Sequence, residues 1–241
     1  MILKEDNIIY EDREMIVCHK PSGIATQTAK LGQQDMVSSV KNYLKSPYVG
    51  VVHRLDQPVE GILVFGKTKE AAAKLSAQSM EKRYYAVVLA GFDMAKKWKE
   101  GYAETEFTLV DYLVKNGKDN TSKIADKNDK DAKRAELTYR ILKISEEDEN
   151  TGNILMFTEV LLKTGRHHQI RVQMTHAGLP LLGDIKYGSK ASISKSLENG
   201  INDVALCAHS LTFLHPQTGK SMIFSIAPKG EAFRLFLPVN P

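Results

Sequence analysis

Cysteine is scarce in this sequence. The two cysteines, Cys18 and Cys207, stand far apart, and each lies in an apolar, strand-like run. Two distant cysteines do not form the disulfide framework of a small secreted protein. We interpret both as buried free thiols, which fits a reducing compartment and predicts a cytoplasmic protein.

Long hydrophobic runs are also missing. No stretch approaches the roughly 18 consecutive apolar residues that a membrane-spanning helix needs, and no basic start followed by an apolar run marks a signal peptide. The sequence therefore predicts no membrane partner. Because it shows no repeat of exposed apolar residues, we also expect a monomer.

A strong excess of charge of one sign is absent. The chain has 33 Lys and Arg residues against 29 Asp and Glu residues, a net charge of +4. This charge permits a polyanionic partner without requiring one. Any recognition of nucleic acid must therefore depend on a local patch.

Hydrophobic patterning, which alternates at 107–114 and 136–142 and is continuous at 84–90, predicts many strands and few helices. Strands are expected at 7–10, 15–19, 61–67, 84–90, 107–114, 136–142, 154–162, 204–214 and 222–226, and helices at 37–44, 69–82, 166–177 and 231–236. Strands that follow one another directly indicate an α+β fold with a mainly antiparallel sheet. No linker forces a second domain, so we predict one domain over 1–241, with a solvated and non-catalytic polar hairpin tip or insertion at about 115–133.

Asp56 is the first candidate for chemistry. It ends the run His53-Arg54-Leu55-Asp56, after two β-branched residues and close to Pro58. Such strand ends and loops often carry function. Nearby positive charge favours the ionised carboxylate, which can act as a nucleophile or a base. On spacing alone, an Asp that caps a turn beside a solvated Arg is the simpler interpretation.

The predicted helix that starts at Arg166, with Thr164 as its N-cap, is the second candidate. Ile170 belongs to its apolar stripe, and Arg171 lies at the edge of that stripe, half-buried, where a guanidinium needs a carboxylate partner. Arg166 would lie in the first turn, where backbone N–H groups can meet a phosphate. A solvated surface helix explains this segment equally well.

Three histidines in the same region, His167, His168 and His176, raise the question of a metal site. None is four residues from another, and the sequence has no His-Glu-x-x-His motif and no cysteine pair. We therefore predict no metal.

Several segments, taken together, resemble a known family. They are Tyr10, Asp12 and Lys20-Pro21-Ser22-Gly23; His53-Arg54-Leu55-Asp56 with Gly61; Lys82-Arg83-Tyr84-Tyr85-Ala86; Thr164-Gly165-Arg166 with His168-Gln169-Ile170-Arg171; Gly183-Asp184 with Tyr187-Gly188; and Leu211, Phe213, His215 and Pro216. In this order they resemble the motifs of the RluA-type pseudouridine synthases, over nearly the whole chain.

The resemblance implies a mixed, mainly antiparallel sheet with flanking helices and a central cleft, and isomerisation of a uridine in rRNA or tRNA without cofactor or metal. The target base would be flipped out of its stack. Asp56 would be the essential carboxylate, Tyr84 would stack on the uracil and could assist proton removal at C5, and Arg171 would pair with Asp56. Arg54 would enter the vacated stack, and Arg166 would contact phosphate.

Lys20, His53 and Ile170 complete the RNA-binding set that the resemblance implies. The small S4-type RNA-binding domain that many members carry ahead of the catalytic core is not expected here, so the surface of the core would hold the RNA.

The sequence departs from the family pattern at three positions. Val59-Glu60 stands where the family commonly has Thr-Ser, which removes a hydroxyl and adds a negative charge near the expected polyanion. Cys207 stands where the family often has His. Asp56, Arg54 and Gly61 match.

Two other functions are considered. A non-catalytic RNA-binding protein on the same scaffold would account for Val59-Glu60. A hydrolase or nuclease would use His167 or His168 as a general base, although no partner nucleophile stands out.

Overall fold

The computed structural model describes residues 5–28, 30, 32–91, 96, 105–148 and 151–237. The chain forms two compact units, each described separately below. Unit 1 comprises Met1–Lys82 and Cys207–Pro228, and unit 2 comprises Arg83–Leu206 and Lys229–Pro241. The prediction of one domain over 1–241 stays a prediction.

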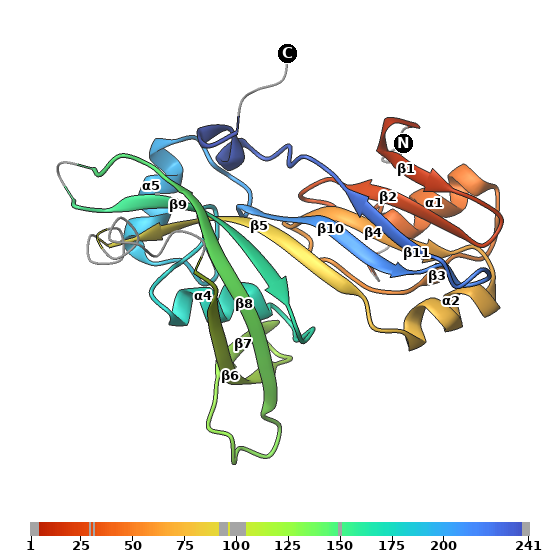
Figure 1. Ribbon diagram of the computed structural model, residues 1–241, viewed down its shortest axis with the longest axis horizontal. Helices are drawn as coiled ribbons and strands as arrows, with labels where there is room; N and C mark the ends of the chain where they lie inside the picture. Colours follow the sequence, from red (N-terminus) through yellow and green to blue (C-terminus); the bar gives the residue numbers. More distant parts are fainter. Residues whose placement is uncertain are drawn as a thin grey trace. The chain divides into compact units, whose positions relative to one another are not determined.

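Unit 1 contains a mixed sheet (Figure 1). Its strands are β1 (Ile8–Glu11), β2 (Met15–Lys20), β3 (Gly50–Val51), β4 (Glu60–Gly66), β10 (Leu206–Leu214, whose first residue belongs to unit 2) and β11 (Ser221–Ser225). They follow the order β1-β2-β4-β10-β11, and β3 pairs with β4. The pair β4–β10 is parallel and the other pairs named here are antiparallel.

Two helices accompany this sheet, α1 (Met36–Leu44) and α2 (Lys69–Ala77). Asp35 and Ser38 begin α1 with reciprocal side-chain-to-backbone hydrogen bonds, and Thr68 caps α2. The core packs residues of one sheet face against α2: Met15, Val17, Ile62, Val64, Leu75, Leu211, Phe213 and Phe224. Removing this much apolar surface from water drives folding of the unit.

Unit 2 contains the strand order β5-β9-β8-β6-β7. The strands are β5 (Glu81–Ala90, whose first two residues belong to unit 1), β6 (Phe107–Asn116), β7 (Thr121–Ile124), β8 (Lys133–Ile144) and β9 (Ile154–Leu162). The pairs β6–β7, β6–β8 and β8–β9 are antiparallel. The helices are α4 (Gln169–His176) and α5 (Lys190–Glu198), and η3 (Glu231–Leu235) is a 3-10 helix.

The α+β class and the mainly antiparallel mixed sheet are therefore confirmed. Helix boundaries differ from the prediction. The helix expected over 69–82 ends at Ala77, because the chain from Glu81 onward pairs as strand β5 despite its good helix formers. The last predicted helix is a 3-10 helix.

The helix expected over 166–177 starts only at Gln169. Its N-cap is His168, in the left-handed region at φ 53°, rather than Thr164. The Thr164 hydroxyl instead bonds the Gln169 side chain at 2.9 Å and accepts the Glu136 N–H at 2.8 Å. Arg166 consequently lies in the turn before the helix.

The polar segment 115–133 forms part of a β-hairpin. It holds the β6–β7 turn and all of β7, which pairs with β6 from Leu113↔Ile124 to Asn116↔Thr121. Among the described residues, no helix is long and apolar enough to cross a membrane.

Candidate active site

The loop that carries Asp56 connects β3 to β4 and has a tightly bonded backbone. Carbonyl groups at four consecutive positions accept hydrogen bonds: Leu55 from the Thr26 hydroxyl at 3.0 Å, Asp56 from the Val59 N–H at 3.0 Å, Gln57 from Lys20 Nζ at 3.0 Å and Pro58 from the Ser22 hydroxyl at 2.7 Å. The Thr26 hydroxyl also accepts the Leu55 N–H at 3.1 Å. With its polar backbone groups paired, this loop holds the partly buried Asp56 in one place.

Lys20 lies in the interior, whereas a phosphate contact would lie on the surface. Its side chain is fully buried, and Nζ donates to the carbonyls of Pro21 at 2.9 Å, Ile24 at 2.6 Å and Gln57 at 3.0 Å. An ammonium has three donors, so these acceptors compensate its burial. The geometry favours a supporting contact to the Asp56 loop.

Two neighbours of Asp56 have contrasting surroundings. Arg54 is exposed, and its Nη2 donates to Gln27 Oε1 at 3.1 Å. His53 Nε2 accepts the Val64 N–H at 3.4 Å, while burial, and then the charge of Lys82, lower the His53 pKa to about 3. At neutral pH, Arg54 therefore offers a charge at the surface and His53 a neutral imidazole.

Val59 and Glu60, the departures from the family pattern, both face the interior. The Glu60 carboxylate lies 3.4 Å from Nε2 of buried His19. Cys207 is the register partner of Glu60 across β4–β10, and burial, with Glu60 nearby, raises the pKa of its thiol. The negative charge of Glu60, which was expected near the RNA, thus lies inside unit 1. Two of the three departures, Glu60 and Cys207, are neighbours. At the next position, Gly61 has φ 138°, and a Cβ there would collide with Ala208.

Arg171 has a buried carboxylate partner, as its predicted place on the helix requires. Nε donates to Asp184 Oδ2 and Nη2 to Asp184 Oδ1, both at 2.7 Å. The guanidinium carbon also lies 5.0 Å from the centre of the Tyr187 ring. Such a two-point contact fixes both position and orientation, so Arg171 is a rigidly held cation.

The Asp184 carboxylate is itself held by its own loop. Its Oδ1 accepts the backbone N–H groups of Lys186 at 3.0 Å and Tyr187 at 3.1 Å. These N–H groups, together with Arg171, hold the carboxylate in one orientation. Asp184 therefore suits its place as counter-ion to Arg171.

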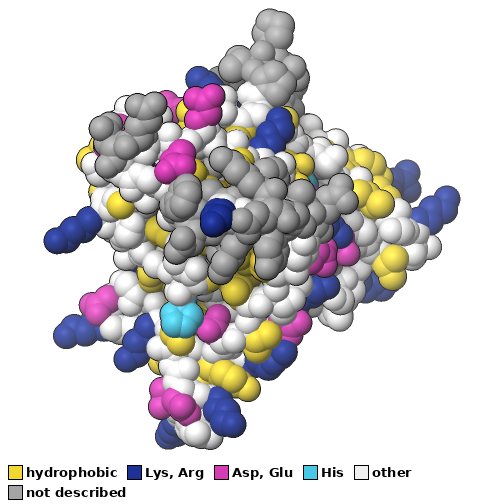
Figure 2. Space-filling model, turned by 60° about the vertical axis from the view of Figure 1, so that its left-hand side comes forward, with side chains coloured by type: hydrophobic (Ala, Val, Ile, Leu, Met, Phe, Trp, Pro, Cys, Tyr) yellow, Lys and Arg dark blue, Asp and Glu magenta, His cyan; other side chains and the backbone are white. Residues whose placement is uncertain are grey.

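Arg166 is exposed in the turn before α4. Its Nε donates to the Arg134 carbonyl at 2.9 Å, and its backbone N–H donates to Gln169 Oε1 at 2.9 Å. Arg134 is exposed as well. The Arg134 guanidinium pairs with Glu136, and Arg166 does not lie within the first helical turn. On the face drawn in Figure 2, basic and acidic side chains are interspersed.

Tyr84 and Ile170 are the least exposed of the predicted contact residues of unit 2 apart from Arg171. Tyr84 lies in β5 with 7% of its surface exposed, and Ile170 lies in the first turn of α4 with 5% exposed. Burial of this degree holds both side chains in a fixed orientation.

His167 and His168 form a stacked pair, with ring centres 3.7 Å apart. Burial is the first cause that lowers both pKa values, that of His167 to about 4 and that of His168 to about 3. Nearby Lys115, Lys186 and Arg171 lower them further. Within the described residues, no group of three His, Cys, Asp or Glu side chains could hold a metal ion.

A match to a family model identifies the protein family of this chain. Residues 14–176 match the model of the family described as RNA pseudouridylate synthase, which covers more than half of the chain. The chain belongs to the RNA pseudouridylate synthase family. It is thus an isomerase acting on RNA, a pseudouridine synthase.

Relatives of this pseudouridine synthase support the assignment. It is 32% identical, over 96% of this chain and 70% of the relative, to ribosomal large subunit pseudouridine synthase C of Buchnera aphidicola subsp. Schizaphis graminum. It is 32% identical, over 92% of this chain and 90% of the relative, to tRNA pseudouridine synthase C of Haemophilus ducreyi. The solved structure of human RNA pseudouridylate synthase domain containing 1 shares the fold, with a TM-score of 0.70 and 19% identity over 92% of this chain and 83% of the human chain.

The structure groups the predicted site residues of this pseudouridine synthase by unit. Unit 1 contains Lys20, His53, Arg54 and Asp56, and unit 2 contains Tyr84, Arg166, Ile170 and Arg171. Within unit 1, Lys20 contacts the Asp56 loop directly. Within unit 2, Ile170 and Arg171 are consecutive in α4, and Arg166 precedes them in the adjoining turn.

Sequence reasoning missed four side chains of the site. Thr26 and Ser22 bond the Asp56 loop, and Asp184 and Tyr187 hold Arg171. Asp184 and Tyr187 belong to one of the motifs shared with the family, but neither was predicted to have a role. The requirement that a half-buried guanidinium has a carboxylate partner was the signal that could have identified Asp184.

Proposed function

We propose that this pseudouridine synthase isomerises specific uridines in rRNA or tRNA, with Asp56 as the essential carboxylate. The observation that carries the proposal is the hydrogen-bonded loop that holds Asp56. The names of the relatives, a ribosomal large subunit enzyme and a tRNA enzyme, supply the two RNA classes.

The reaction moves the uracil ring without gain or loss of atoms. The C1′–N1 bond breaks, a C1′–C5 bond forms, the proton at C5 leaves, and N1 gains a proton. Asp56 begins this sequence by attack at the sugar, by attack at the base, or by removing a proton to give a glycal. Each route needs an ionised carboxylate in contact with a nucleotide whose base has left its stack.

Arg171 is proposed to keep Asp56 ionised and oriented. Its Nε and Nη2 engage Asp184, which holds the guanidinium in one orientation. A cation close to a carboxylate lowers the pKa of the carboxylic acid. Tyr84 is proposed to stack on the flipped uracil and to assist removal of the C5 proton, and Ile170 to contact the same base.

The exposed arginines are proposed to hold the RNA. Arg54 would fill the stack that the uridine leaves, and Arg166 would contact a backbone phosphate. His53, neutral at physiological pH, would bind RNA through hydrogen bonds or packing. Lys20, fully buried, is proposed to act by holding the Asp56 loop.

Release of tritium from RNA labelled at C5 of uridine tests the proposal. Wild-type protein should release tritium from total tRNA or total rRNA, and Asp56→Asn should abolish release while RNA binding persists. Asp6→Asn, at another acidic position of unit 1, is the matched control and should keep the wild-type rate. No release from either RNA pool would refute the proposed function. Release unaffected by Asp56→Asn would refute the role of Asp56, and bound RNA without release would favour the non-catalytic alternative.

We further propose that the enzyme acts in the cytoplasm as a monomer without metal or cofactor. Cys18 and Cys207 are buried free thiols, which supports a reducing compartment. Sedimentation at micromolar concentration should give the mass of one chain. Chelation with EDTA should leave tritium release from a short RNA unchanged.

A further inference from the structure

The β6–β7 hairpin bonds directly to the surroundings of Arg171, although its sequence predicts a solvated, non-catalytic segment. Ser122, in β7, is buried, with 5% of its surface exposed. Its backbone N–H donates to the Tyr187 hydroxyl at 2.8 Å, and its own hydroxyl lies 2.9 Å from His167 Nδ1. One residue of the hairpin thus contacts two segments that flank Arg171 in sequence.

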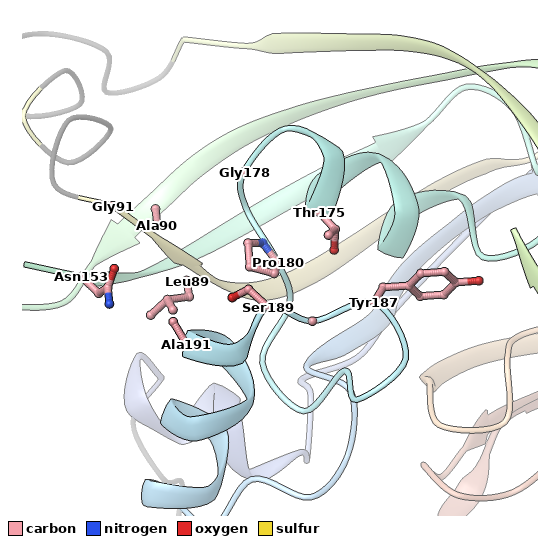
Figure 3. Close-up of a pocket in the computed structure, with 11 residues that line it drawn as sticks. Leu89, Ala90, Gly91, Asn153, Thr175, Gly178, Pro180, Tyr187, Ser189 and Ala191 are labelled. Carbon is pink, nitrogen blue, oxygen red and sulfur yellow. The ribbon is translucent and has the colours of Figure 1, made fainter. Parts of the chain in front are cut away.

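Tyr187 connects this hairpin to Arg171. Its hydroxyl lies 2.7 Å from His168 Nδ1, its ring lies 5.0 Å below the Arg171 guanidinium, and its backbone N–H donates to Asp184. A cavity of about 360 Å³ borders this residue, and Figure 3 shows the ring pointing away from the other labelled lining residues. The Tyr187 ring is therefore directed towards the cation and not into the cavity.

Apolar packing supports the same connection. Leu113 of β6 and Val172 of α4 belong to one buried cluster, and Ile124 of β7 and Tyr187 pack against it. Packing alone leaves a phenol ring able to slide along an apolar surface. Hydrogen bonds to its hydroxyl remove that freedom.

His167 completes the contact between the hairpin and the turn before α4. Its Nε2 lies 3.1 Å from Asn120 Oδ1, so Nε2 carries the proton and Nδ1 accepts from the Ser122 hydroxyl. The neutral His167 ring stacks on His168. Lys186, beside Tyr187, also donates to the Asn120 carbonyl at 3.1 Å.

We propose that Ser122 is a positioning residue of the pseudouridine synthase site, acting through Tyr187 and His167 on Arg171. The inference rests on the proposed function, in which Arg171 orients Asp56. A displacement of reacting groups by about 1 Å can lower a rate by up to about 100-fold. Loss of either hydrogen bond should therefore lower kcat while leaving RNA binding, and so KM, nearly unchanged.

The experiment compares kcat and KM for pseudouridine formation in Ser122→Ala, Ser122→Thr and Tyr187→Phe. Ser122→Ala should lower kcat about 3- to 10-fold and Tyr187→Phe about 10-fold or more, with KM within about twofold. Ser122→Thr keeps the hydroxyl and should restore most of kcat. Ser145→Ala is the matched control, because the Ser145 hydroxyl also makes two hydrogen bonds, at the β8–β9 connection of the same unit.

The outcomes separate the inference from the function on which it rests. An active wild type with kcat unchanged in both Ser122→Ala and Tyr187→Phe overturns the inference and leaves the function standing. An equal loss of kcat in Ser145→Ala, or a loss that Ser122→Thr does not reverse, also overturns it, because a general loss of stability would then explain the data. An inactive wild type overturns both.

Discussion

The pair of Arg171 and Asp184 provides the sharpest test of the structure. Both residues are buried, Arg171 with 4% and Asp184 with 1% of its surface exposed, and two hydrogen bonds of 2.7 Å join them. Asp184→Asn keeps the shape of the side chain and an oxygen for the N–H groups of Lys186 and Tyr187, but it removes the charge. The substitution therefore removes the charge and the acceptor that faces Arg171 Nε, and it leaves the backbone hydrogen bonds in place.

The expected magnitude follows from the burial of the pair. Removing one partner of a buried ion pair costs about 3–5 kcal/mol, because the other charge remains in the interior. For a protein of this size, each kcal/mol lowers Tm by about 2–4 °C. Asp184→Asn should therefore lower Tm by roughly 6–20 °C. It should also lower kcat, because Arg171 loses its fixed orientation.

Thermal unfolding followed by circular dichroism measures the first effect, and tritium release measures the second. Asp203→Asn, an exposed position of the same unit, is the matched control and should change stability by less than about 0.5 kcal/mol. A Tm for Asp184→Asn within about 2 °C of wild type would contradict the reasoning. So would an equal loss in Asp203→Asn.

Three further predictions concern the RNA, the Asp56 loop and pH. Arg166→Ala should weaken RNA binding and reduce the slope of log K against log salt concentration by about one. Arg234→Ala is the control and should leave the slope unchanged. An unchanged slope in Arg166→Ala would show that this residue does not contact the RNA. Lys20→Met should lower Tm and kcat without changing the salt slope, because three partly buried carbonyl groups lose their donor, at up to about 1–3 kcal/mol each. A smaller slope at constant Tm would instead show a phosphate contact. Folding lowers the pKa of His53 from 6.5 to about 3. The stability that neutral His53 contributes is therefore fully present above pH 6.5. That contribution declines by about 1.4 kcal/mol per unit as pH falls from 6.5 towards 3. Denaturant unfolding at pH 7.5 and pH 5 should show a weaker pH dependence for His53→Gln than for wild type, and equal dependence would refute the assignment.

The sequence by itself determined the fold class, the family and the positions of the candidate chemistry. The run 154–162 was predicted as a strand and forms β9, because a short, nearly continuous apolar run with β-branched residues is a local property of the sequence. The motif around Asp56 was identifiable because its chemistry needs particular residue types in a particular order. The need of Arg171 for a carboxylate partner also followed from its place on a predicted helix edge.

Only the tertiary structure decided which partner each group has. Asp184 meets Arg171, Glu60 meets His19, and Lys20 meets the carbonyls of the Asp56 loop, all through contacts between segments that sequence spacing does not join. Helix ends at Ala77 and Gln169 depended in the same way on strand pairing and on side-chain bonds across the fold.

The hairpin at 115–133 shows the difference most clearly. Its Lys, Asp and Asn residues indicate solvation, because composition reports the average environment of a segment. Burial of Ser122 against Tyr187 and His167 depends instead on the register of β6 with β7 and on the packing of α4 beneath them. Register and packing are set by the whole unit, so only the folded chain could show that this polar segment reaches the surroundings of Arg171.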